Sequence, residues 1–175
     1  MAIEPGSYKF GPNNGEMLVK IFREGMAKKA GHDLIIEVKS WEADATIAEQ
    51  PQDSTFSGSA DVGSFNVRTG VGGVKPLSDG DKADIKKNIT QKILTSPTIS
   101  FKSTGVNPST DMITGDLTIM GRTQPVDVKI TESGGKVNAK LTVVQSKWGI
   151  KPFTAMMGAL KVRDAVDIEI SGSAG

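Results

Sequence analysis

The chain has 175 residues, with 21 Lys and Arg against 20 Asp and Glu and a formal net charge of +1. This length fits a single domain, residues 1–175, around one core, and the balanced charge argues against a polyanionic partner such as nucleic acid or an acidic membrane. The sequence contains no cysteine, which excludes disulfides and thiol nucleophiles. It also lacks a transmembrane segment and an apolar leader. We therefore expect a cytoplasmic protein, or a periplasmic or secreted one if an export signal has been removed.

Apolar and polar residues alternate through the first half of the chain, and this pattern predicts half-buried β-strands at 7–10 and 16–22. Between residues 34 and 47 the apolar positions change parity after Ser40, and between 56 and 67 they change parity around Gly63. A strand that changes parity must bulge or bend. Two such changes favour a sheet that curls strongly enough to close.

A helix is predicted over residues 80–94. Ile85, Ile89 and Ile93 recur at four-residue spacing, and Ser78 followed by Asp81 resembles a capping box. The apolar stripe is narrow, so we expect this helix to lie across the outside of the sheet or to cap an open end. A second, short helix is predicted near residues 154–160.

The second half of the chain is dominated by one-sided strands, expected at 98–106, 112–120, 124–132, 137–145 and 162–171. Short connections containing turn glycines join several of them, which is typical of an antiparallel meander. About eight strands with their apolar faces on one side must pack on a second sheet or close into a barrel. The predicted fold class is therefore all-β, a single antiparallel barrel.

The predicted interior combines Ile, Val and Leu with Gly58, Ala60, Gly115 and Ala139, and includes almost no aromatic residues. An eight-stranded barrel can be filled by its own side chains or can hold one slender ligand. Small residues inside favour the second outcome.

Residues 145–162 contain an uncharged apolar stretch between Lys151 and Lys161, with Trp148 ahead of it. Such a cluster either plugs one end of the core or lines a ligand cavity. The paired methionines would suit an adaptable wall, and Gly149 and Gly158 provide hinges. We expect this segment to close the barrel and to contact whatever lies inside.

His32 is the only histidine, so a cluster of several histidines around a metal is impossible. We expect no catalytic residue and no metal site. Two alternatives stay open: an enzyme that acts on a lipophilic substrate through His32, and an interaction module whose barrel is filled and holds no ligand.

Three segments together resemble the YceI-like family of lipocalin-like, polyisoprenoid-binding proteins: SPTISFKSTGV at 96–106, ITGDLTIMGRTQPVDVKI at 113–130 and QSKWGI at 145–150. The resemblance implies an extended lipocalin-like barrel crossed by a helix. It also implies a bound isoprenoid, such as a quinone or a polyprenyl phosphate, held for carriage, storage or sensing. No cofactor is required beyond this lipid, and a homodimer is left open.

The predicted contacts with this lipid are inward residues of the meander and of the closing segment, with His32 and the neighbouring Lys28 or Lys29 near the headgroup. The predicted ligand-binding set is Ile99, Phe101, Leu117, Ile119, Leu141, Val143, Trp148, Phe153, Met156, Met157, Leu160 and His32.

Overall fold

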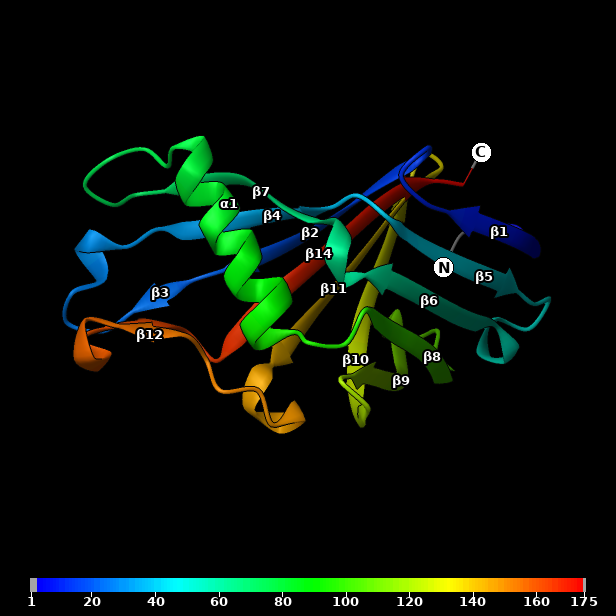
Figure 1. Cartoon of the computed structure of the whole chain (residues 1–175). Coiled ribbons are helices and arrows are strands. Elements are labelled where there is room, and N and C mark those ends of the chain that lie inside the picture. The colour runs from blue at the N-terminus through cyan, green and yellow to red at the C-terminus, as the bar shows by residue number, and fades with distance from the viewer. Residues whose placement is uncertain (1–2, 175) are drawn as a thin grey trace.

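One strongly curled antiparallel sheet forms the body of the protein, and helix α1 crosses its open side (Figure 1). The structure is a computed structural model that describes residues 3–174, without the side chain of Met156. The strands are β1 (Gly6–Phe10), β2 (Gly15–Ile21), β3 (Arg23–Glu24), β4 (Asp33–Val38), β5 (Trp41–Ile47), β6 (Thr55–Asp61), β7 (Phe65–Val71), β8 (Thr98–Asn107), β9 (Met112–Ile119), β10 (Arg122–Ser133), β11 (Lys136–Val144), β12 (Thr154–Ala155), β13 (Leu160–Val162) and β14 (Ala165–Ser173).

The main sheet has 11 strands in the order β1-β5-β6-β8-β9-β10-β11-β14-β2-β4-β7. The predicted meander is confirmed, because β8, β9, β10, β11 and β14 are successive neighbours in this order. The hairpin between β10 and β11 turns at Gly134 and Gly135, whose φ angles of 60° and 81° are left-handed and therefore suit glycine. The all-β, lipocalin-like class expected from the sequence is correct, but the 11-stranded sheet has β1 and β7 as its two edges, so it forms a half-barrel and not the closed barrel of about eight strands that was expected.

The two predicted changes of parity are the bends that curl the sheet. β4 pairs with β7 and β5 pairs with β6, so these strands are successive halves of one long, bent hairpin. At the bend, the amide of Lys39 donates to the carbonyl of Ser64 and that of Asp61 donates to the carbonyl of Ser40, both at 3.0 Å. One half of the hairpin ends the sheet next to β2, while the other half pairs with β8. The bent hairpin thus links the two sides of the curled sheet.

The predicted helix is confirmed as α1 (Asp79–Asn88), which continues into a π turn at Ile89–Ile93. Its first turn carries the predicted capping box: the Ser78 hydroxyl accepts from the Asp81 amide at 3.1 Å, and the Asp81 carboxylate accepts from the Ser78 amide at 2.9 Å. The inward side of the helix packs on a buried cluster that contains Ile36 and Phe65. Of the two placements expected for it, α1 adopts the second and caps the open side of the sheet (Figure 1).

The short helix predicted near 154–160 is wrong. These residues form β12, one 3-10 turn at Met156–Gly158, and β13, which also pairs with β3 in a small second sheet. Met157 and Gly158 have φ angles of 56° and 87°, and this left-handed pair reverses the chain instead of continuing a helix. The run of apolar residues therefore forms a hairpin of β12 and β13.

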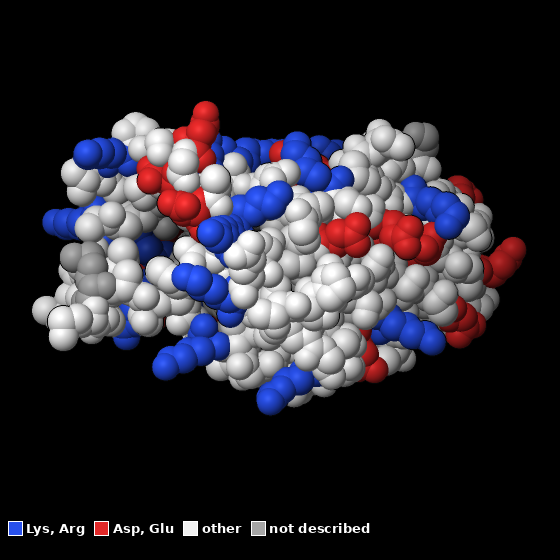
Figure 2. Space-filling model, viewed as in Figure 1, with Lys and Arg blue, Asp and Glu red and all other residues white. Residues whose placement is uncertain are grey.

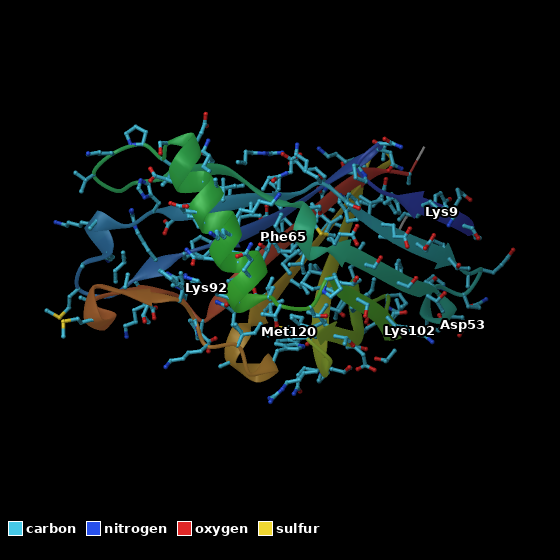
Figure 3. The ribbon with its side chains drawn as sticks, in the orientation of Figure 1. Lys9, Asp53, Phe65, Lys92, Lys102 and Met120 are labelled. Carbon is cyan, nitrogen blue, oxygen red and sulfur yellow. The ribbon has the colours of Figure 1, made fainter. Side chains whose placement is uncertain are left out.

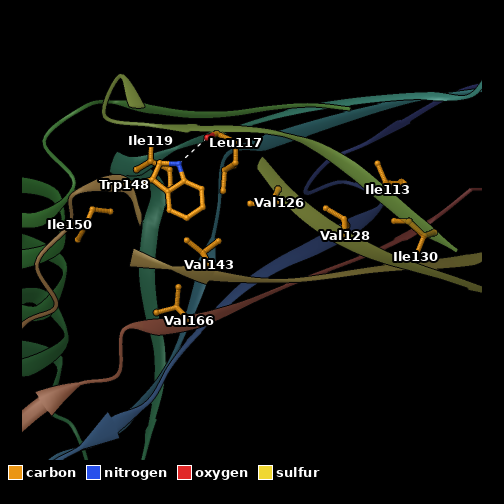
Figure 4. Close-up of a cluster of buried hydrophobic side chains, with 10 residues drawn as sticks. All are labelled: Ile113, Leu117, Ile119, Val126, Val128, Ile130, Val143, Trp148, Ile150 and Val166. Atoms are coloured by element: carbon orange, nitrogen blue, oxygen red, sulfur yellow. Dashed lines mark hydrogen bonds between the residues drawn. The ribbon is translucent and has the colours of Figure 1, made fainter. Parts of the chain in front are cut away.

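Two clusters of buried apolar side chains hold the sheet together. The larger one joins β9, β10, β11 and β14 to Trp148, which is 2% exposed and whose indole nitrogen donates to the carbonyl of Leu117 at 2.9 Å (Figure 4). The second cluster joins β2, β4 and the bent hairpin to α1. The two clusters share partly buried residues such as Ile99 and Ile168. Within residues 3–174, no helix combines the length and apolar character needed to span a bilayer.

Glu169 on β14 joins a chain of ion pairs on the outer face of the sheet. Its carboxylate oxygens lie 2.7 Å from Lys20 Nζ and 3.6 Å from Lys140 Nζ. The hydrogen bond from Lys20 lowers the pKa of Glu169 below its ordinary value of 4.5, against the opposing effect of burial. Because the folded-state pKa is depressed, this interaction stabilises the fold above the ordinary pKa, and its contribution is lost as the pH falls through the folded-state pKa.

We expect Glu169→Gln to lower the free energy of unfolding by less than about 1 kcal/mol at neutral pH, because the pair is partly exposed. The difference from wild type should shrink as the pH falls from neutral through the lowered pKa of Glu169. Urea denaturation at a series of pH values measures it, with Glu49→Gln, an exposed glutamate, as the control. A deficit that persists at low pH would show that the carboxylate charge is not its cause.

Candidate functional site

A first apolar cavity of about 180 Å³ lies inside the curled sheet toward β1, β5 and β6. Small side chains leave this space open, namely Ala43 and Ala45 of β5, Ala60 of β6 and Ala139 of β11. The ring of Phe101 forms part of the wall. It lies against Gly115 on the neighbouring strand, where any side chain would collide with it. Of the small inward residues predicted from the sequence, Gly58, Ala60 and Ala139 line this cavity, whereas the space beside Gly115 is occupied by the ring of Phe101.

A second cavity of about 310 Å³ lies on the α1 side of the sheet. Ile85 and Ile89 of the helix face Ile119 of β9 and Val143 of β11 across it. The walls are apolar through most of this cavity. Polar side chains are confined to a few positions, which are Arg23, His32, Asn88, Gln145 and Lys161.

The two cavities meet inside the sheet. Both are lined by the same residues at their junction: Val19, Phe65, Ile99, Leu117 and Ile168. Figure 3 places Phe65 near the middle of the molecule, beside α1. The two cavities are therefore neighbours inside the sheet, separated only by these shared side chains.

Arg23, His32 and Lys161 form the polar mouth of the second cavity. Arg23 Nε lies 3.7 Å from Asp33 Oδ1, and its Nη1 also donates to the carbonyl of Gly31. Lys161 belongs to β13, which pairs with β3, and it stands opposite Glu24, the residue that follows Arg23. Three cationic or protonatable residues from separate segments therefore line one end of the second cavity.

Residues 70–76 form a loop that fits closely over this mouth. Gly72 and Gly73 have φ angles of 82° and 75°, and a side chain at either position would collide with Arg23 or His32. His32 Nε2 lies 2.6 Å from the carbonyl oxygen of Lys75. A carbonyl oxygen can only accept, so this nitrogen donates and its lone pair is not available as a base.

Most of the predicted ligand-binding residues lie on these cavities. The first cavity is lined by Phe101 and Leu141, the second by His32, Ile119, Val143, Phe153 and Leu160, and both by Ile99 and Leu117. Phe153 stands at the mouth and is 45% exposed.

The remaining predicted contacts lie elsewhere. Trp148 is buried in the wall of the sheet and lines neither cavity, while Met157 is fully exposed. The side chain of Met156 lies outside the described part of the chain. Lys28 and Lys29 are exposed on the short turn that precedes His32 and do not line the cavity.

Some lining residues are absent from the predicted set. Arg23 carries a signal that could have identified it, because it continues the inward parity of Met17, Val19 and Ile21. The interior is also more aromatic than expected, since Phe10, Phe56, Phe65 and Phe101 all line the first cavity. Lys161 had no such signal, because it lies in a short strand between irregular turns.

A strongly curled antiparallel sheet that is capped by a helix and encloses apolar cavities is a half-barrel of the lipocalin-like, all-β class. The YceI-like domain model matches residues 20–174, and the chain therefore belongs to the YceI-like family. The fold is similar to the crystal structure of BcnA from Burkholderia cenocepacia, with a TM-score of 0.57, 18% identity and coverage of 89% of this chain and 94% of that chain. No curated protein matches the sequence.

Proposed function

We propose that this protein binds a long isoprenoid or a similar amphiphilic lipid, for carriage, storage or sensing. The tail would occupy the two cavities in succession, and the headgroup would lie at the mouth formed by Arg23, His32 and Lys161. The observation that carries the proposal is the shared lining of the cavities by Val19, Phe65, Ile99, Leu117 and Ile168. Membership of the YceI-like family also supports it.

Burial of the tail supplies enough free energy for this function. Each buried CH₂ group gains roughly 0.8 kcal/mol, so three or four isoprene units offer on the order of ten kcal/mol before ordering costs are subtracted. The side chains that line the cavities are mostly apolar, and the polar ones are few. An apolar chain is thus the ligand that these walls favour.

The polar mouth favours an acidic or hydrogen-bond-accepting headgroup. Arginine and lysine attract a phosphate, and any of the three side chains could donate to a quinone carbonyl. The phosphate of a polyprenyl phosphate would interact with the positive charges at the mouth. A quinone is uncharged and would only accept hydrogen bonds from the donors at the mouth. Both remain within the proposed class.

The test is organic extraction of freshly purified protein, followed by mass spectrometry of the extract. We expect a prenyl lipid or a related long-chain amphiphile in stoichiometric amount. Stripped protein should then take up an added prenyl lipid again. A clean extract, together with failure to take up prenyl lipids, would overturn the proposal and favour an interaction module without a ligand.

An enzyme acting on a lipophilic substrate is the second candidate, because His32 lies on the wall of the cavity. Its Nε2 already faces the carbonyl of Lys75, which disfavours a role as general base through that nitrogen. We expect His32→Ala to retain the bound lipid and its chemical form. Conversion of a supplied lipid by wild type, and loss of this conversion in His32→Ala, would establish the enzyme instead.

A further inference from the structure

The large apolar side chains exposed to solvent gather at one end of the protein. Met26, Val71, Val74, Phe153 and Met157 are the exposed ones in the described part of the chain, and Met26 is 98% exposed. They belong to residues 22–33, 70–77 and 149–163, which we call the mouth surface. Burying such side chains is favourable, so a cluster of them marks a surface that meets an apolar partner.

Contacts between backbone segments bring these three parts of the chain together. The amide of Ala27 donates to the carbonyl of Ala159 at 2.9 Å, and β13 pairs with β3. The loop at Gly73 lies against His32. In Figure 1, β3, β12 and the loop before α1 share the left-hand end of the molecule.

The mouth surface is strongly basic although the whole chain is nearly neutral. It contains seven Lys and Arg residues and two acidic ones, which leaves 14 basic and 18 acidic residues in the rest of the chain. Its cations are Arg23, Lys28, Lys29, Lys75, Lys151, Lys161 and Arg163. The balanced total charge therefore conceals a positive end and a negative remainder.

Acidic residues next to the mouth surface disfavour the approach of a negatively charged partner from their side. Asp79 and Asp81 lie in the first turn of α1, and Figure 2 shows acidic side chains gathered where Figure 1 places this helix. The left and lower-left parts of the same view show cations beside uncharged side chains. A negatively charged partner would therefore approach the side formed by β3, β12 and β13 and not the helix.

The same end carries the mouth of the second cavity, with Phe153 and Lys161 belonging to both. At the other cavity, the charged lining residues are instead Glu42 and Asp44. A lipid tail that enters the protein from a membrane would pass most directly through an opening that itself lies against the bilayer.

We propose that the mouth surface docks on an anionic lipid bilayer, with its apolar side chains inserted at the headgroup level and its lysines against acidic lipids. The bilayer thereby delivers or receives the lipid directly through the mouth. The part of this proposal that concerns transfer rests on the proposed function. Docking itself is a separate property, which is measured with empty protein and vesicles that contain no prenyl lipid.

The test is co-sedimentation of stripped protein with phosphatidylglycerol vesicles and with phosphatidylcholine vesicles. We expect binding to the anionic vesicles that weakens as salt is added. A lysine near an anionic surface strengthens binding by roughly fivefold, so Lys28→Glu/Lys29→Glu should weaken it by at least about 25-fold. The matched control is Lys102→Glu/Lys136→Glu, which changes exposed lysines away from the mouth surface and should have a smaller effect (Figure 3 labels Lys102).

A second variant, Met26→Ser/Val74→Ser/Met157→Asn, removes apolar side chains that do not line either cavity, and asparagine tolerates the left-handed backbone at position 157. We expect it to lose vesicle binding while its melting temperature and its uptake of a prenyl probe in solution are retained. Equal vesicle binding by this variant, by the two charge variants and by wild type would overturn the proposal. So would a wild-type dimer that forms through the mouth surface and does not bind vesicles.

Failure of docking and failure of lipid binding give different results. Protein that takes up the prenyl probe without binding phosphatidylglycerol vesicles contradicts only the docking proposal. Protein that binds the vesicles and takes up no prenyl probe contradicts the proposed function and leaves docking established.

Discussion

Replacing Ile99 with tryptophan is expected to weaken binding of a long prenyl tail by more than tenfold. Ile99 lines both cavities, so a larger ring at this position should separate them. If the tail loses contact with only two CH₂ groups, about 1.6 kcal/mol of binding free energy is lost, or roughly fifteenfold in affinity. Titration of stripped protein with a prenyl alcohol longer than either cavity alone measures the change.

Thr98→Trp is the matched control, because Thr98 precedes Ile99 on β8, is exposed and lines neither cavity. This variant should bind the tail as wild type does. Ile99→Trp should also retain more affinity for a short tail that fits one cavity than for a long one. Equal affinity of both variants for the long tail would show that the tail does not pass the junction at Ile99.

Replacing Trp148 with alanine is expected to lower the free energy of unfolding by about 3–5 kcal/mol, the range for truncation of a buried aromatic side chain. Trp148 is 2% exposed, and its indole nitrogen donates to the carbonyl of Leu117. Removal leaves a void in the larger cluster and takes away the hydrogen bond from the indole to the carbonyl of Leu117. Urea denaturation of stripped protein measures the loss.

The variant Trp148→Phe distinguishes a role of Trp148 in the stability of the fold from a role in contacting the lipid tail. It keeps most of the ring volume and removes the hydrogen bond, so we expect a loss of about 1–3 kcal/mol and a folded protein. Its affinity for a prenyl tail should stay within about twofold of wild type, because Trp148 lines neither cavity. A Phe variant of wild-type stability with strongly reduced tail binding would instead place Trp148 on the path of the tail.

The curled sheet could be predicted from the sequence because its cause is local. Successive side chains in a strand face opposite sides of the sheet. A change of apolar parity at Ser40 or Gly63 therefore indicates a bend in the strand, whatever the position of that strand in the fold. The same rule places Ile99, Leu117 and Val143 inside, and it also applies to Arg23. In regular strands, parity alone identifies most of the cavity wall.

The segment 145–162 shows where this rule stops. Trp148 is the last residue of a 3-10 turn that is capped by a left-handed glycine, Gly149, and Met157 itself is left-handed. Neither residue has strand parity, so hydrophobicity alone could not tell that one packs in the wall and the other faces solvent. The cause is tertiary: β13 pairs with β3, more than 130 residues away in the chain.

Charge was misleading for a similar reason. The total of +1 says nothing about which residues the fold brings together. Arg23 and Lys161 are far apart in the sequence and line the same cavity because β13 pairs with β3. Lys75 comes near them through the contact of its carbonyl with His32. A basic surface built from separate segments leaves no run of like charges to detect.

The central claim, that a long apolar tail completes the packing of the two joined cavities, is tested most directly by a series of prenyl alcohols of increasing length. Affinity for the stripped protein should rise with each added isoprene unit until both cavities are filled, and then level off. A length-independent affinity, or one that levels off at a tail too short to pass Ile99, would contradict it.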